Sequence, residues 1–167
     1  MLQNAGLGTL LIDLLEVEEA NDRSKVFDIP LLASRLQAAA AWLASQPETA
    51  GLRLGYFGAS TGAGAALVAA AQAPDSIGAI VSRGGRPDLA KDALPRVTAP
   101  CLLIVGGDDR QVLELNREAY ERLTCLRRVV VVPGATHLFP EPGALEEVAQ
   151  RATEWFLQHL VEPKAVR

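Results

Sequence analysis

The alternation of short strand-like runs with helix-like segments is the feature that most constrains this fold. Apolar or β-branched runs of strand length lie at 8–14, 52–57, 77–82, 101–105 and 128–132. The segments between them are longer, and their apolar residues recur at helical spacing, as Val112, Leu115, Ala119 and Leu123 do. Such alternation predicts an α/β fold, in which a doubly wound, mostly parallel sheet of about five strands has helices on both faces. We expect a single domain spanning residues 1–167.

The composition limits which binding partners and which cellular compartment we expect for this chain. The 167 residues are 49% hydrophobic and 22% charged, which is ordinary for a globular domain. A net charge of -4 gives no reason to expect a nucleic acid as partner. No apolar stretch reaches the roughly 20 residues that a membrane span needs, and the first residues do not have the pattern of a signal peptide. Two cysteines cannot form a disulfide framework, so we expect a cytoplasmic protein. The acidic stretch of Glu16, Glu18 and Glu19 predicts a solvated loop.

Residues 58–62 carry the sequence G-A-S-T-G between a predicted strand and a predicted helix. This is the G-x-S-x-G pattern of a nucleophile elbow, in which a serine, here Ser60, sits on a tight, strained turn. Bulky residues at Gly58 or Gly62 would collide with the strand or the helix. The turn would also aim the backbone N–H of Thr61 at a developing oxyanion, at the positive end of the helix. The pattern is common by chance, so it needs support from other residues.

A serine hydroxyl needs a base to act as a nucleophile, and the chain has two histidines. His137 follows the predicted strand at 128–132 by a short loop, so it is expected at the same edge of the sheet as Ser60. His159 lies near the end of the last predicted helix, where an imidazole suits the negative end of the helix dipole. We therefore interpret His137 as the base and His159 as structural.

The base in turn needs a carboxylate to fix its tautomer. The sequence G-G-D-D-R at 106–110 directly follows a predicted strand and supplies two candidates, Asp108 and Asp109. The resulting order along the chain, serine, aspartate, histidine, is that of the α/β-hydrolases.

Three segments, at 55–67, 99–116 and 129–149, resemble the dienelactone-hydrolase-like family of the α/β-hydrolases. That family places its acid three residues before a valine or similar residue, which implies Asp109 rather than Asp108. Its best-known members have cysteine at the elbow, so Ser60 implies a more general hydrolysis of a small ester, lactone or related acyl substrate. The resemblance implies neither a metal nor a cofactor.

The resemblance also implies that the chain begins partway through the fold, without its first strands. Residues 1–6 resemble the end of the family's first helix. Upstream, the family has further strands and a loop of His-Gly type that donates a second oxyanion N–H. One of those strands normally lies beside the strand that carries the nucleophile. Because an unpaired apolar strand edge invites association, we expect the chain to be a poor catalyst that forms a homodimer through that edge.

Two other classes of function stay open. The sequence G-A-S-T-G-A-G at 58–64 also resembles the glycine-rich turn of short-chain dehydrogenases, which would bind NAD(P) at a helix N-terminus. That turn should follow the first strand of the chain, and the Tyr-x-x-x-Lys pair of that family is absent. The other alternative is a non-catalytic, hydrolase-like binding module, which the missing oxyanion loop favours.

The segment 82–88 is the remaining loop that follows a strand at the expected active edge. Its two arginines, Arg83 and Arg86, could bind a substrate carboxylate as bidentate forks. The alternative is that they pair with Asp88 or Asp92 or face solvent.

Overall fold

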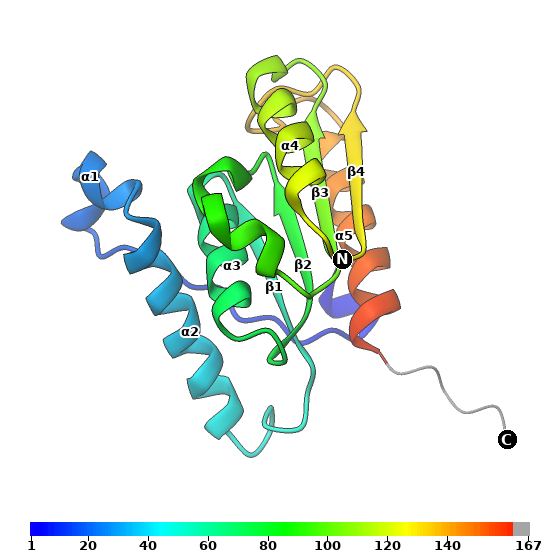
Figure 1. Cartoon of the computed structure of the whole chain (residues 1–167). Coiled ribbons are helices and arrows are strands. Elements are labelled where there is room, and N and C mark those ends of the chain that lie inside the picture. The colour runs from blue at the N-terminus through cyan, green and yellow to red at the C-terminus, as the bar shows by residue number, and fades with distance from the viewer. Residues whose placement is uncertain (162–167) are drawn as a thin grey trace, which may run out of the picture.

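Four parallel strands form the centre of the computed structural model, which describes residues 1–161 (Figure 1). In sheet order, which is also chain order, they are β1 (Leu54–Ala59), β2 (Ile77–Arg83), β3 (Cys101–Gly106) and β4 (Arg127–Val132). These are the last four of the predicted runs, each shifted by no more than two residues at either end. The parallel α/β fold predicted from the alternation is therefore confirmed.

Helices cover both faces of this sheet. The α-helices are α1 (Arg23–Val26), α2 (Ile29–Ser45), α3 (Thr61–Gln72), α4 (Arg110–Arg122) and α5 (Ala144–Leu160), and the 3₁₀ helices are η1 (Gln3–Ala5), η2 (Glu19–Asn21) and η3 (Pro87–Arg96). Figure 1 shows α3, α4 and η3 in front of the strands, α2 outside α3, and α5 behind the sheet. The sheet is doubly wound, as the sequence predicts.

The two faces of the sheet bury separate apolar cores. All six residues of β3 are buried, as expected for an inner strand of a parallel sheet covered on both sides. Because successive side chains point to opposite faces, Ile80 and Leu103 pack in the core under α3, whereas Val81 and Ile104 pack in the core under α5. The inner strands are packed on both faces, and the loops at their carboxyl ends start from this packed sheet.

The predicted strand at 8–14 is wrong. Residues 7–13 form no strand, and Leu10, Leu11 and Ile12 are 46%, 87% and 42% exposed. Apolar composition gives such a run the propensity for a strand, but a strand needs a partner that takes up its N–H and C=O groups. Among residues 1–161 none pairs with this run, and the outer side of β1 is likewise unpaired. The sheet described here has four strands instead of about five.

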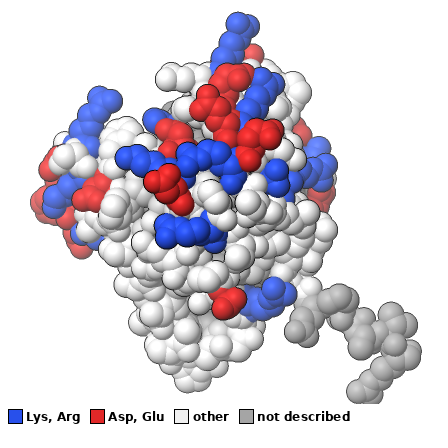
Figure 2. Space-filling view, viewed as in Figure 1, with Lys and Arg blue, Asp and Glu red and all other residues white. Residues whose placement is uncertain are grey.

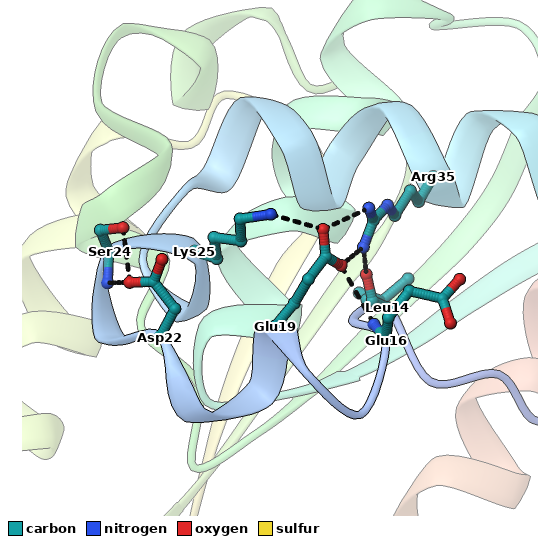
Figure 3. Close-up of polar contacts among 7 residues, drawn as sticks. All are labelled: Leu14, Glu16, Glu19, Asp22, Ser24, Lys25 and Arg35. Carbon is teal, nitrogen blue, oxygen red and sulfur yellow. Dashed lines mark hydrogen bonds and ion pairs between the residues drawn. The ribbon is translucent and has the colours of Figure 1, made fainter.

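The acidic stretch near the N-terminus differs in part from the solvated loop that we predicted, since Glu16 and Glu18 are exposed but Glu19 is not. The side chain of Glu19 is only 15% exposed, and its carboxylate binds Lys25 and Arg35 (Figure 3). Arg35 lies on α2 and also donates to the carbonyl oxygen of Leu14 at 2.7 Å. The hydrogen bond from Arg35, followed by that from Lys25, holds the pKa of Glu19 well below its ordinary value. We call this contact between Glu19 and Arg35 the N-terminal clasp, because it ties the segment before α2 to that helix.

Charged side chains are unevenly spread over the visible surface. Figure 2 shows positive and negative groups interspersed over the part of this face that α4 and η3 form, while the lower part carries few charges. In the part of the chain that the structure describes, none of the helices combines the length and the apolar character needed to cross a membrane.

Candidate active site

Ser60 lies on the turn between β1 and α3 in a strained backbone conformation. Its φ and ψ are 48° and -124°, a combination that non-glycine residues adopt only where the surroundings enforce it. The turn also depends on the glycine before it, since a Cβ at Gly58 would lie 2.6 Å from the carbonyl oxygen of Gly62 and 2.7 Å from the backbone nitrogen of Ala63. These are the features of the elbow that the sequence predicts.

The second glycine of the motif has a different role from the one predicted. A Cβ at Gly62 would meet nothing within 4 Å among the described residues. The predicted collision is therefore wrong at Gly62 and applies only to Gly58. The reason is that a Cβ at Gly62, on the first turn of α3, would face open space, whereas one at Gly58 would meet the backbone of that turn.

The loop after β2 holds the backbone of Ser60 from both sides. The N–H of Ser60 donates to the carbonyl oxygen of Arg83 at 3.4 Å, and the carbonyl oxygen of Ser60 accepts from the N–H of Arg86 at 3.0 Å. This carbonyl also accepts from the N–H of Ala63 at 3.1 Å. The strained turn is thus fixed by hydrogen bonds to a neighbouring strand end and to its own helix.

Thr61 is the first residue of α3, which places its backbone N–H at the positive end of that helix. A first-turn N–H has no acceptor within its own helix, so that of Thr61 is free for another group. Among the described residues none accepts a hydrogen bond from it.

The structure brings Asp109 and His137 into contact at the carboxyl ends of β3 and β4. Asp109 Oδ2 and His137 Nδ1 lie 2.6 Å apart, and the two side chains are 15% and 40% exposed. Asp108 is exposed and its carboxylate makes no hydrogen bond within residues 1–161. Of the two candidate carboxylates, it is therefore Asp109 that can fix the orientation and the tautomer of the imidazole.

Backbone contacts hold the loops of this pair together. The N–H of Asp108 donates to the carbonyl oxygen of Ala135 at 3.0 Å, and that of Gly107 donates to Val132 at 2.8 Å. A Cβ at Gly106 would lie 2.3 Å from the carbonyl oxygen of Ala135, so only glycine permits this approach. The distance between the carboxylate and the imidazole is therefore set by the main chain.

Further contacts, which involve Phe139, Glu141 and Gly84, hold the loop that carries His137. Phe139 is buried, with a φ of 57°, and its N–H donates to the carbonyl oxygen of Thr136 at 3.1 Å. Thr136 in turn donates from its hydroxyl and its N–H to Glu141, and these bonds lower the pKa of that carboxyl, with the hydroxyl as the main cause. At Gly84, after β2, a Cβ would lie 3.6 Å from His137 Nδ1. Three loops therefore meet around the imidazole.

Ser60 and His137 follow strands that end at the same edge of the sheet, but no hydrogen bond joins the Ser60 hydroxyl to His137 within residues 1–161. Hydrogen bonds of this kind are often long or poorly aligned before a substrate binds. The other histidine, His159, lies on the last turn of α5 and packs against Trp155, with ring centroids 4.4 Å apart. Burial first, and then the charge of Arg53, lowers the pKa of His159.

The two arginines after β2 have different surroundings. Arg86 donates from Nε and from one terminal nitrogen to the two carboxylate oxygens of Asp88, both at 2.8 Å. This is the alternative weighed from the sequence, and it occupies the fork that a substrate carboxylate would need. Arg83 makes no ion pair among the described residues, and its guanidinium lies over the ring of Phe139, 5.9 Å from the centroid.

Asn116 is a buried polar residue near this site that the sequence analysis missed. It lies on α4, is fully buried, and donates from Nδ2 to the carbonyl oxygens of Val112 and Gly85. The buried face of the helix runs through Val112, Asn116 and Ala119, whereas Leu115 is only partly buried. The signal was present, since an asparagine at the fourth position after Val112 interrupts an otherwise apolar stripe.

Comparisons with known proteins identify the family and agree with the fold. The dienelactone hydrolase family matches residues 19–161. A solved dienelactone hydrolase from Anabaena variabilis is 58% identical and superposes with a TM-score of 0.92 over 96% of this chain and 76% of its own. Est1E from Butyrivibrio proteoclasticus, at 17% identity and a TM-score of 0.67 over 78% of this chain and 70% of its own, shares the fold alone.

Two curated relatives come from Mycobacterium tuberculosis, and each is named “Putative phosphoribosyl transferase”. They are 60% identical to this chain over 163 residues, which cover 98% of this chain and 37% of theirs. The chain therefore spans little more than a third of the length of these relatives.

Proposed function

Because the chain belongs to the dienelactone hydrolase family, we propose that it is a serine hydrolase that acts on a small ester, lactone or related acyl substrate. The observation that carries this proposal is the 2.6 Å contact between Asp109 and His137 at the sheet edge where the strained turn presents Ser60. A nucleophile, a base and an orienting carboxylate are the three groups that acyl transfer through serine requires.

In the proposed mechanism each residue has one role. His137 takes the proton of the Ser60 hydroxyl on Nε2, since its Nδ1 is engaged with Asp109. The Ser60 oxygen attacks the carbonyl carbon, and the N–H of Thr61 stabilises the oxyanion. The protonated His137 then gives its proton to the leaving group, so that an acyl-enzyme forms. A water molecule, deprotonated by His137, attacks the acyl group and releases the acid while Ser60 regains its proton.

Arg83 is the arginine that we propose for contact with an anionic acyl group, because Arg86 is already paired with Asp88. The proposed chemistry needs no metal or cofactor, since every proton is moved by His137 and the nucleophile is a side chain. We propose the cytoplasm as the compartment, on the composition alone.

The transferase name of the mycobacterial relatives is not carried over to this chain. The matched part is 37% of those proteins, and the same residues match a hydrolase family. The family match also removes the support for a dehydrogenase with a dinucleotide-binding turn. The non-catalytic binding module remains the competing proposal, and it predicts that Ser60 is unreactive.

A fluorophosphonate probe separates an enzyme from a binding module, because it labels only an activated serine. We expect the wild-type chain to be labelled at Ser60 and Ser60→Ala to lose both labelling and turnover of p-nitrophenyl acetate, with its circular dichroism unchanged. Ser34→Ala is the matched control, since Ser34 is an exposed serine on α2 that bonds only its own helix at Leu31. Undiminished turnover by Ser60→Ala, or a wild-type chain that is not labelled, would contradict the proposal.

A further inference from the structure

Asn116 makes one contact that its own helix does not explain. Its bond to the Val112 carbonyl oxygen, at 2.8 Å, lies within α4. Its bond to the Gly85 carbonyl oxygen, at 3.0 Å, instead reaches the loop after β2, and among the described residues Asn116 is the one donor to that oxygen. A buried amide is costly to place unless its hydrogen bonds are made, and Asn116 Oδ1 is buried with no partner among the described residues. The bond to Gly85 is therefore one of the two that hold this side chain in its buried position.

The carbonyl of Gly85 and the N–H of Arg86 belong to the same peptide group. That N–H donates to the carbonyl oxygen of Ser60 at 3.0 Å. Because a peptide group is planar and rigid, fixing its oxygen also fixes the direction of its N–H. Asn116 thus orients, through one planar group, a hydrogen bond on the residue that carries the proposed nucleophile.

The loop has little freedom to make up for the loss of this bond. A Cβ at Gly85 would lie 1.9 Å from Ser82 Oγ and 2.6 Å from the Cβ of Ala63, so the loop is pressed against β2 and α3. Ser82 Oγ itself is buried and has no hydrogen-bond partner among the described residues, so it does not replace Asn116 as a donor. A strained residue such as Ser60 keeps its conformation only while its surroundings hold it from several sides.

Helix α4, which carries Asn116, also lies next to Asp109 in the chain. Asp109 directly precedes the first residue of α4, and Asn116 lies seven residues later, about 10 Å along the helix axis. We infer that Asn116 is a positioning residue, which couples the helix that follows Asp109 to the backbone of Ser60 through the Gly85–Arg86 peptide. This inference rests on the proposed function for its effect on catalysis, while the coupling itself is a property of the fold.

Asn116→Ser is the variant that tests this inference. A helical serine can still bond the carbonyl four residues before it, here Val112, but it is too short to reach Gly85. We expect the rate of fluorophosphonate labelling and the kcat for p-nitrophenyl acetate to fall about tenfold to a hundredfold, as for a small misplacement of a reacting group. KM should change much less, because no group that contacts the substrate is removed.

Leu123→Ala is the matched control. Leu123 is buried in the core under α3 and directly follows the last residue of α4. It should lower the unfolding temperature while keeping the labelling rate, with both variants assayed well below their midpoints. If Asn116→Ser is labelled as fast as the wild type, or if Leu123→Ala loses rate in the same proportion, Asn116 is not a positioning residue.

Hydrogen exchange gives a readout that does not depend on activity. In Asn116→Ser the Arg86 amide should exchange faster, together with the peptide that contains Ser60, whereas Leu123→Ala should leave that local pattern unchanged. A wild-type chain that the probe does not label would remove the proposed function. In that case, exchange of the Arg86 amide would still test the coupling between Asn116 and the Ser60 backbone. Unchanged protection of this amide in Asn116→Ser would contradict the coupling, and a local loss of protection would support it.

Discussion

The N-terminal clasp and the loops around His137 both rely on a carboxylate contact, but they differ in what surrounds it. Glu19 binds two cationic side chains that keep their charge at neutral pH, and the nearby Leu10–Ile12 run stays exposed and unpaired. Asp109 instead binds an imidazole, and its loop is joined to the His137 loop by main-chain hydrogen bonds. A polar contact can thus hold a segment against a helix without adding that segment to the sheet. A site also needs its loops to be fixed by the packing around them.

The two pairs also differ in their chemistry, because the carboxylates bind different kinds of side chain. A guanidinium does not give up its proton in a protein, so the pair of Glu19 and Arg35 can only hold structure. An imidazole can accept and release a proton on its free nitrogen, which is the role proposed for His137 beside Asp109. Substitutions at the two pairs should therefore differ in effect, with catalysis reduced by changes at Asp109 and stability reduced by changes at Glu19.

The largest effect is expected from the carboxylate that contacts His137. Asp109→Asn should lower kcat by orders of magnitude, because the amide no longer selects the tautomer with a free Nε2, a loss of about 10⁴ in a serine protease. Asp108→Asn, one residue away and exposed, should change kcat only slightly. Steady-state kinetics with p-nitrophenyl acetate measures both, and a larger loss in Asp108→Asn would show that the wrong carboxylate has been assigned.

The two glycines of the elbow should respond oppositely to alanine. Gly58→Ala places a Cβ against the backbone at Gly62 and Ala63, so we expect about 1–3 kcal/mol of destabilisation and slower labelling of Ser60. Gly62→Ala meets no atom within 4 Å and stands inside a helix, so it should be neutral or stabilising by up to about 1 kcal/mol. Urea unfolding gives both values, and equal destabilisation would contradict the packing described here.

The free side of β1 should make the chain self-associate. We expect the sedimentation coefficient to rise with concentration, because the N–H and C=O groups on that side lack strand partners among the described residues. Phe57→Lys, at an exposed position of β1, should weaken the association, while Leu126→Lys, at an exposed position just before β4, should not. A wild-type chain that sediments as a monomer at all concentrations would count against the proposed homodimer.

The smallest effect on catalysis is expected at the N-terminal clasp. The pKa of Glu19 is lowered in the folded protein, chiefly by Arg35, so its stabilisation is present above the ordinary glutamate pKa of 4.5 and disappears as the pH falls through the folded value. Glu19→Gln should therefore unfold at a lower temperature than the wild type at pH 7, with a difference that shrinks on acidification. Its kcat at neutral pH should be unchanged.

Glu18→Gln is the control for that experiment, since Glu18 is exposed and its carboxylate has no partner within residues 1–161. It should unfold like the wild type at every pH. A difference between Glu19→Gln and the wild type that grows as the pH is lowered would have the wrong sign for a depressed carboxyl pKa.

Most of the fold and part of the site could be predicted from local patterns. The four strand runs, the elbow at Ser60 and the loops that hold Asp109 and His137 are each readable within a few residues. One general rule then brings them together, since the carboxyl ends of parallel strands share an edge. The choice between Asp108 and Asp109 came from resemblance, and the structure adds the contact of Asp109 with His137.

The sequence by itself thus determined the class of fold and the sheet edge at which the candidate site residues gather, because these depend on periodicity and chain direction. Only the tertiary structure decided that residues 8–14 form no strand, that Gly62 has open space and that Arg86 is held by Asp88. It alone also showed that the amide of Asn116 reaches Gly85. Each of these depends on a distance between atoms that local periodicity does not encode, set by how the loops and helices pack.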